Sequence, residues 1–312
     1  MKIFESLSNI EKFPNPVLTI GNYDGIHIGH QEIIRRVVAK AKEMSGTPML
    51  MTFNPHPLSV LKPDSYIRLI TPLHLKKKLI KSLGIEVMLI LPFDTQFQDL
   101  PPEMFVQRVL SEKIGVKWIY VGYDFKFGKN GKGTVDTLKD LSKVYNFESD
   151  VVQAIQINGE RVGSNAIRKL IMEGDVEKAG QFLGRPHMIE GTVVKGENRG
   201  KHMGFPTINL DTFFELVPKN GVYVTEVELK GKSKPAVTNI GYNPTFGGKK
   251  FLMETHILDF SGNLYGKEVM IYFHKRIRQE MKFSGMEELK QRIAGDIATA
   301  REYFQNNGSL KP

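Results

Sequence analysis

Two histidines stand in a glycine-punctuated segment, GNYDGIHIGH, which spans residues 21–30. His27 and His30 are separated by two residues, and Gly25 and Gly29 are in the same segment. Glycines let a backbone turn sharply and approach a ligand, while the first turn of a helix offers free N–H groups and a positive dipole end to an anion. Imidazole groups placed there can stabilise negative charge that grows on a phosphorus centre. The segment therefore predicts a phosphate site.

An isolated His-x-x-His pair also has a plainer interpretation, in which one histidine caps a helix and the other is a hydrogen-bonded core residue. A zinc pair is less favoured, because no third ligand stands near the two histidines in the sequence. The context supports the phosphate site, since an apolar strand at Val17 to Ile20 precedes the turn and an amphipathic helical pattern follows it.

A second candidate site lies in RGKHMGFPTIN, residues 199–209. Strand alternation places Thr207 and Asn209 on one face, so that two side-chain oxygens converge. Magnesium prefers oxygen ligands, and a neutral pair can suffice if a nucleotide supplies the charge. Taken alone, the same pattern is more simply two polar residues on the wet face of a strand.

The first half of the chain must position the histidines, and it alternates short β-rich runs with amphipathic helical runs. This pattern is typical of an open parallel sheet covered by helices, an α/β fold whose ligands bind beyond the carboxyl ends of the strands. We expect strands at 17–20, 49–53, 86–91, 118–122 and 151–157. We expect helices after the glycine turn and near 72–83, 102–113, 135–145, 165–172 and 176–182, the second with Thr71 as N-cap and Pro72 at its first position.

The second half has closely spaced strands separated by turn residues, as in a small antiparallel barrel or sandwich. The strands are expected at 190–194, 205–210, 222–229, 236–240, 253–260 and 269–273. Ser284 and Glu287 predict a capping box that opens a last helix, which runs to about Phe304. Gly184 and Pro186 mark the expected boundary, which divides the chain into domains 1–185 and 186–312.

Composition narrows the class of protein. The chain has 312 residues and no cysteine, which excludes disulfides and thiolate chemistry and fits a reducing compartment. We find no signal peptide and no apolar run long enough to cross a bilayer, so we expect a soluble, cytoplasmic protein without a membrane partner. Lys and Arg number 43 against 34 Asp and Glu, a surplus that attracts nucleotides or nucleic acids. The densest basic run, Lys76 to Lys78, is interpreted as a solvated helix face.

Several motifs occur together in a fixed order along nearly the whole chain. They are GNYDGIHIGH, TFNPHP at 52–57, GYDFKFG at 122–128, the segment 162–168, GFPTIN at 204–209 and NIGYNPTF at 239–246. Together they resemble the prokaryotic bifunctional riboflavin kinase/FAD synthetase family. The first motif also resembles the HIGH nucleotidyltransferase superfamily, but the chain has no KMSKS-like loop of the class I aminoacyl-tRNA synthetases.

The resemblance implies a Rossmann-like adenylyltransferase domain in 1–185, which transfers AMP from ATP to FMN and yields FAD. It implies a riboflavin kinase β-barrel with a C-terminal helix in 186–312, and Mg²⁺ in both reactions. The implied roles are these: catalysis of adenylylation by His27 and His30; ATP binding by Asn22, Asp24, Gly25, Gly29, Ser164 and Arg168; flavin binding by Asn54, His56 and Asp124; Mg-ATP binding in the kinase by Lys201, Gly204, Thr207 and Asn209, with Thr207 and Asn209 as metal ligands; the kinase base Glu254; and a flavin or nucleotide neighbour, Asn239.

The family usually has Ile-Ser-Ser-Thr/Ser-x-Ile-Arg where this chain reads VGSNAIR at 162–168. Ser164 and Arg168 are kept but two hydroxyls are lost, which we expect to affect the rate of adenylylation more than its existence. Strand alternation puts Glu254 beside His256 and Leu258, so periodicity leaves the direction of that face open.

Two alternatives stay open at this point. One is a riboflavin kinase whose first domain is degenerate. The other, ranked far lower, is a nucleic-acid-binding module, because Phe205, Tyr223 and Tyr272 are scattered singly rather than interleaved with basic residues. We therefore expect small-molecule substrates and no nucleic-acid partner, and the sequence leaves the oligomeric state open.

Overall fold

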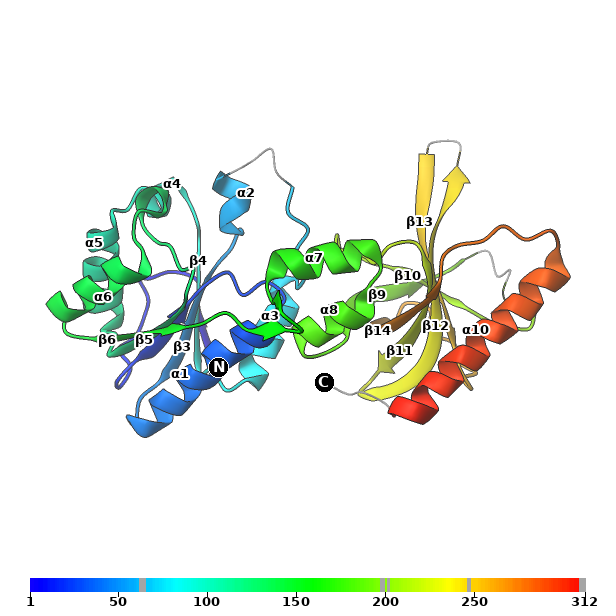
Figure 1. Ribbon diagram of the computed structural model, residues 1–312, viewed down its shortest axis with the longest axis horizontal. Helices are drawn as coiled ribbons and strands as arrows, with labels where there is room; N and C mark the ends of the chain where they lie inside the picture. The colour runs from blue at the N-terminus through cyan, green and yellow to red at the C-terminus, as the bar shows by residue number, and fades with distance from the viewer. Residues whose placement is uncertain (62–65, 197–199, 201–202, 246–247, 309–312) are drawn as a thin grey trace. The chain divides into compact units, whose positions relative to one another are not determined.

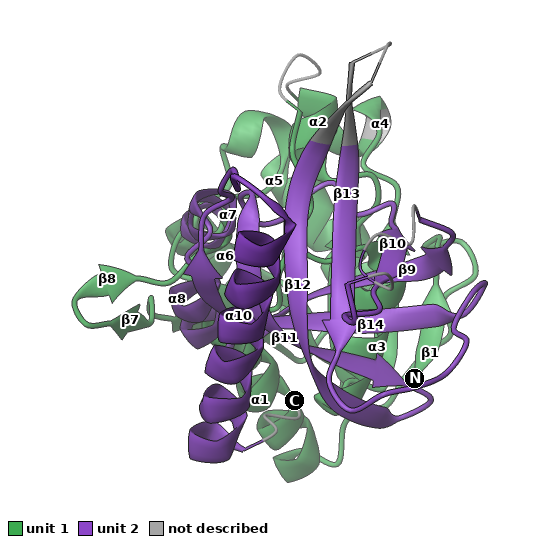
Figure 2. Cartoon of the chain, turned by 90° about the vertical axis from the view of Figure 1, so that its right-hand side faces the viewer, with its two compact units in different colours: residues 1–164 green, residues 165–312 purple. Residues whose placement is uncertain are grey.

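The computed structural model describes residues 1–61, 66–196, 200, 203–245 and 248–308. The chain forms two compact units, residues 1–164 and 165–312, which are coloured separately in Figure 2. None of the described helices is long and apolar enough to cross a membrane.

The first unit is built on a six-stranded sheet with the order β1-β4-β3-β2-β5-β6, in which every pairing is parallel. Its strands are β1 (Lys2–Phe4), β2 (Val17–Ile20), β3 (Pro48–Phe53), β4 (Val87–Leu91), β5 (Trp118–Gly122) and β6 (Glu148–Val152). The expected open parallel sheet is confirmed. The edge strand β1 was not predicted, and the expected strand at 151–157 is replaced by β6 and a small hairpin of β7 (Gln156–Ile157) and β8 (Glu160–Arg161).

Helices cover both faces of this sheet, as Figure 1 shows. On one face lie α1 (Ile28–Glu43) and α3 (Leu73–Ser82), whose buried Ile34 and Ile80 pack with Val17 and Leu50 of the strands. On the other lie α6 (Val135–Val144) and a π-helix, η1 (Phe105–Ile114), which continues the short α5 (Pro102–Met104). Because neighbouring residues of a strand point to opposite faces, the same strands contribute side chains to the hydrophobic cores on both faces of the sheet.

Two expectations about α3 are wrong. Pro72 is the N-cap residue rather than the first helical residue, and Thr71 does not cap the helix with its side chain. Instead the backbone N–H of Thr71 donates to the carboxylate of Asp24. Lys76 is 5 % exposed, so this lysine does not belong to a solvated face.

The second unit contains a closed barrel, with the strand order β10-β13-β12-β11-β14-β9 and antiparallel pairings. The strands are β9 (His187–Val194), β10 (Ile208–Asp211), β11 (Gly221–Leu229), β12 (Lys232–Thr245), β13 (Gly248–Ile257) and β14 (Glu268–Arg278). Of the two predicted alternatives, barrel and sandwich, the barrel is therefore the one that forms.

Helices also accompany the barrel in the described part of the chain. They are α7 (Ser164–Glu173), α8 (Val176–Leu183) and α10 (Met286–Asn307). The helix α10 packs on β11 and β12, where Ala300 meets Val222 and Val237 (Figure 2). Its N-cap is Gly285, and Ser284 bonds to Glu288 through both its N–H and its hydroxyl, so the capping box with Glu287 is wrong. The boundary between the compact units falls in the sequence between Ser164 and Asn165. The expected division into an adenylyltransferase domain 1–185 and a kinase domain 186–312 stays a prediction.

Candidate active sites

The turn after β2 follows an unusual backbone path. Tyr23, Gly25 and Ile26 have φ angles of 49°, 86° and 44°, in the left-handed region that costs free energy for residues with a side chain. Tyr23 is held by a hydrogen bond between its hydroxyl and that of Thr19, and the carbonyl of Ile26 accepts from Nε2 of Gln31 at 2.8 Å. The sequence segment GNYDG is thus fixed in one conformation at the carboxyl edge of the sheet.

His27 and His30 are in direct contact at the start of α1. His27 is the N-cap residue, and its Nδ1 accepts a hydrogen bond from the backbone N–H of His30 at 3.3 Å. The two rings stack with centroids 3.6 Å apart. A Cβ at Gly29 would lie 3.1 Å from the ring of His27, so glycine leaves the room that this ring needs. The plainer interpretation is therefore right in part: His27 does cap the helix, and its Nδ1 acts as an acceptor.

His30 is partly buried and lies near His27 and Lys76. Burial lowers its pKa well below the ordinary value, and the nearby His27 and Lys76 act in the same direction. Within the described part of the chain, its buried Nδ1 has no hydrogen-bond partner. His30 is consequently a neutral imidazole at pH 7.

Lys76 and Asp24 anchor the turn from both sides. The ammonium group of Lys76 donates to the carbonyl of Asn22 at 2.7 Å, and the hydroxyl of Thr52 donates to the same oxygen at 3.2 Å. Burial lowers the pKa of Lys76, against the opposing effect of Asp24. The buried carboxylate of Asp24 accepts from the N–H groups of Ile70 and Thr71 at 3.0 to 3.2 Å. Sequence reasoning missed Lys76, because only the packing of α3 shows that it is buried.

Ser164 reaches the same turn, since its hydroxyl donates to the carbonyl of Asp24 at 2.8 Å. Arg168 belongs to the second unit, where its guanidinium donates to the side chain of Asn165 at 2.6 Å.

The predicted flavin contacts follow β3 and β5, the two strands that flank β2 in the same sheet. Asn54 and His56 come after β3, and Nδ1 of His56 accepts from the N–H of Leu58 at 3.2 Å. Asp124 comes after β5 and forms a 2.7 Å ion pair with Arg161 of the β7–β8 hairpin. Because the strands are parallel, both segments leave the sheet at the edge where the histidine turn also lies. Arg161 carries no motif signal in the sequence.

A cavity of about 1060 Å³ lies in the second unit, and three adjacent strands place polar residues along it. The strand register pairs Glu254 of β13 with Asn209 of β10 on one side and with Asn239 of β12 on the other. All three line the cavity, as do Thr207 and His256. The neighbouring residues Thr225, Thr238 and Thr255 are fully buried and form a chain of hydroxyl contacts of 2.8 and 2.9 Å. The register thereby shows what periodicity left open: Glu254 and His256 point into the cavity.

The donor set is suited to a magnesium nucleotide. Thr207 and Asn209 offer neutral oxygens at the cavity wall, and Gly204 precedes them with a φ of 88°. Lys201 lies outside the described residues. Within the described chain no group of three His, Cys, Asp or Glu side chains can hold a metal ion, so a metal here would depend on the nucleotide for its charged ligands.

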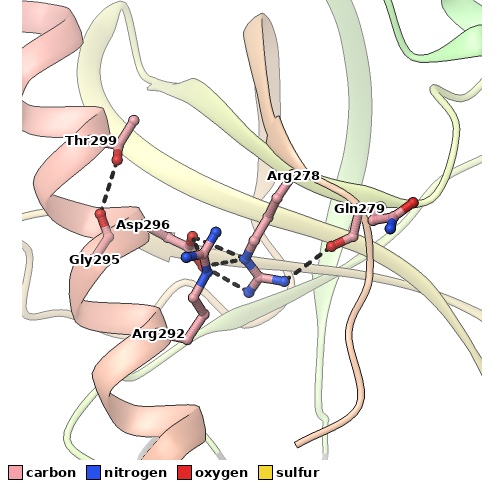
Figure 3. A network of polar contacts seen from close by, with 6 residues as sticks. All are labelled: Arg278, Gln279, Arg292, Gly295, Asp296 and Thr299. Atoms are coloured by element: carbon pink, nitrogen blue, oxygen red, sulfur yellow. Dashed lines mark hydrogen bonds and ion pairs between the residues drawn. The ribbon is translucent and has the colours of Figure 1, made fainter.

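The cavity wall also contains a charged pair that the sequence did not reveal. Arg278 ends β14 and Asp296 lies on α10, and both line the cavity. Figure 3 shows the guanidinium of Arg278 facing the carboxylate of Asp296. The two residues are 18 positions apart and belong to no motif, which is why sequence reasoning missed them.

Comparisons with known proteins assign each half of the chain to a family. Residues 9–166 match the family model described as FAD synthetase, and residues 183–304 match that described as riboflavin kinase. A protein of Escherichia coli strain K12 named bifunctional riboflavin kinase/FMN adenylyltransferase is 34% identical over 100% of both chains. A protein of Bacillus subtilis strain 168 with the same name is 37% identical over 95% of both chains. A crystal structure from Streptococcus pneumoniae, described as a macrolide-efflux protein, is 31% identical with a TM-score of 0.88, covering 96% of this chain and 98% of its own.

Proposed function

The chain belongs to the bifunctional riboflavin kinase/FMN adenylyltransferase family, and we propose that the histidine turn and the barrel cavity carry its two reactions. The enzyme phosphorylates riboflavin to FMN and transfers AMP from ATP to FMN, which yields FAD and pyrophosphate. ATP and flavins are its substrates. The assignment of residues to the two steps, the domain limits 1–185 and 186–312, and the need for Mg²⁺ are our proposals.

For adenylylation, the proposal places the ATP phosphates at the N-terminus of α1. A phosphate oxygen of FMN attacks the α-phosphorus, the bond to the β-phosphate oxygen breaks, and pyrophosphate leaves. His27 and His30 stabilise the negative charge on the transferred group, while Lys76 and Asp24 hold the turn that carries them. A bound triphosphate raises the pKa of His30, because its negative charge opposes the effects of burial and Lys76.

For phosphorylation, Glu254 accepts a hydrogen bond from the primary hydroxyl of riboflavin and takes its proton as the new P–O bond forms. Thr207 and Asn209 would hold Mg²⁺, which supplies neutralisation of the phosphate charge when bound. Asn239, paired with Glu254 in the strand register, orients the substrate beside the base.

The observation that carries the proposal is the row Asn209, Glu254 and Asn239 on three adjacent strands along one cavity. The test incubates the purified chain with riboflavin, ATP and Mg²⁺, and separates the flavins by chromatography. We expect FMN and then FAD, and we expect EDTA to stop both steps. Persistence of both steps in EDTA would contradict the role of Mg²⁺.

The segment 162–168 sets the rate of the second step in our proposal. Ser164 keeps its contact with the turn, but Gly163 and Asn165 stand where the family usually has hydroxyl residues. Restoring these with Gly163→Ser and Asn165→Thr is expected to raise the adenylylation rate several-fold. An unchanged or lower rate would contradict this.

We further propose that the enzyme acts in the cytoplasm on small molecules alone, without nucleic acid. ATP, its co-substrate, is a cytoplasmic metabolite, and the surplus of 43 basic over 34 acidic residues suits anionic nucleotides. Cell fractionation tests the location. Tight, salt-sensitive RNA binding would contradict the proposal that the enzyme acts without nucleic acid.

A further inference from the structure

Arg278 and Asp296 form a forked ion pair between the barrel and its C-terminal helix. Nε of Arg278 donates to the two carboxylate oxygens of Asp296 at 3.0 and 3.1 Å, and Nη2 donates to Oδ2 at 2.8 Å. The side chains are 11% and 3% exposed. Arg292 adds a second, half-exposed cation 3.7 Å from Oδ1 of Asp296 (Figure 3). Arg278 and Arg292 together therefore hold the carboxylate of Asp296 in the cavity wall.

The same guanidinium also holds the segment between β14 and α10. Nη1 of Arg278 donates to the carbonyl of Gln279 at 3.1 Å, and the guanidinium carbon lies 5.7 Å from the ring centroid of Phe283. Met281 and Phe283 of this segment line the cavity. One side chain thus contacts both structures that form this part of the wall.

Apart from the charged Arg278, Glu280 and Asp296, this part of the wall is apolar, in contrast to the polar row on the strands. The helix α10 contributes Leu289, Ile293 and Ile297. A triphosphate requires polar donors and metal, whereas the flat isoalloxazine ring of riboflavin is suited to an apolar and aromatic surface. The apolar wall is therefore the flavin-facing part of the cavity.

We propose that Arg278 and Asp296 are positioning residues of riboflavin phosphorylation, whose ion pair holds residues 279–285 and α10 in place as the flavin-facing wall. The inference rests on the proposed placement of the kinase reaction in this cavity. A buried ion pair adds little net stability over apolar residues of similar volume, but its fork permits only one arrangement of the two elements. Its contribution is accordingly to the geometry of the site.

The chain supplies a matched control pair. Arg301 of α10 donates to Asp259, just beyond β13, with two bonds of 2.8 and 2.7 Å. This pair also ties α10 to the barrel, but its side chains are 49% and 71% exposed and neither residue lines the cavity. The control pair is also an arginine–carboxylate ion pair that involves α10, but it does not contact the flavin-facing wall.

The experiment compares Arg278→Lys and Asp296→Asn with Arg301→Lys and Asp259→Asn in the full chain. Kinase rates are measured against riboflavin at saturating ATP and against ATP at saturating riboflavin. Adenylylation of supplied FMN reports on an intact first unit. We expect the KM for riboflavin to rise about tenfold or more in the Arg278 and Asp296 variants, with the KM for ATP within about twofold of wild type. The control variants should stay within about twofold for both substrates.

A fifth variant separates positioning from folding. The double change Arg278→Met and Asp296→Leu leaves no unpaired buried charge, so its Tm should stay near that of wild type. Its KM for riboflavin should nevertheless remain raised. A wild-type KM for riboflavin in this variant, equal rises in both KM values, or loss of folded protein in all three variants would overturn the proposal. Kinase activity that survives Glu254→Gln would instead contradict the placement of the reaction in this cavity.

Discussion

The imidazole rings of His27 and His30 stack with centroids 3.6 Å apart, and the Nδ1 of His27 accepts the backbone N–H of His30. This contact makes His27 the cap of α1 and places the ring of His30, whose Nδ1 is buried, directly against it. Burial, together with the nearby His27 and Lys76, lowers the pKa of His30, so its ring is uncharged at pH 7. This arrangement is the one on which the proposed phosphate site rests.

The first prediction concerns His30 itself. His30→Gln removes an imidazole from the proposed phosphate site, and we expect adenylylation of FMN to fall roughly 100-fold. Phosphorylation of riboflavin should stay within about twofold, since it is placed in the other unit. The control is His74→Gln on α3, which should leave both rates unchanged. Equal adenylylation rates in the two variants would rule out the role of His30.

Lys76 gives a second prediction. Lys76→Met removes the bond to the carbonyl of Asn22 and the buried charge beside the histidines, so adenylylation should fall roughly 10-fold or more. Lys81→Met, an exposed lysine of the same helix, serves as the matched control. Rates are measured with supplied FMN and ATP. Equal adenylylation rates in the Lys76→Met and Lys81→Met variants would contradict the role of Lys76 in the site.

The third prediction tests the base of the kinase. Glu254→Gln keeps the shape and hydrogen bonding of the side chain but cannot take a proton, so we expect phosphorylation to fall by about 100-fold or more. Adenylylation of supplied FMN should persist. Glu268→Gln, at the exposed start of β14, should leave phosphorylation at its wild-type rate. A Glu254→Gln enzyme that phosphorylates riboflavin normally would refute the assignment.

His187 gives a prediction on pH. Burial lowers its pKa to about 3, with the positive charge of Arg185 as the next cause. The unfolded chain protonates this histidine near pH 6.5, whereas the folded chain does not until far lower pH. The unfolded state therefore binds more protons below pH 6.5, and the free energy of unfolding should decrease by about 2 kcal/mol from pH 7 to pH 5 on account of His187.

The measurement compares wild type with His187→Gln, whose side chain does not titrate. Kinase activity that remains after heating is recorded as a function of temperature at pH 7 and pH 5. The wild type should lose more thermal resistance on acidification than the variant does. Equal losses would show that His187 does not contribute to the pH dependence.

The sequence determined the kind of fold and supplied the hypotheses on the chemistry of the sites. Alternating strand and helix patterns predicted the parallel sheet, and closely spaced strands predicted a barrel or a sandwich, because these periodicities depend only on which face each residue must bury. Residue types at fixed spacing likewise indicated a phosphate turn and an oxygen-rich strand. The sequence did not fix the residues that cap the helices. Pro72 and Ser284 both differ from expectation, because several nearby groups can accept a hydrogen bond from the same N–H.

Only the tertiary structure decided which residues meet. The burial of Lys76 depends on how α3 packs on the sheet, and the direction of Glu254 depends on its register with Asn209 across two strands. The pair of Arg278 and Asp296 joins a strand to a helix with no motif in common. Register, burial and long-range ion pairs are properties of the assembled chain, because each depends on a partner that lies far away in the sequence.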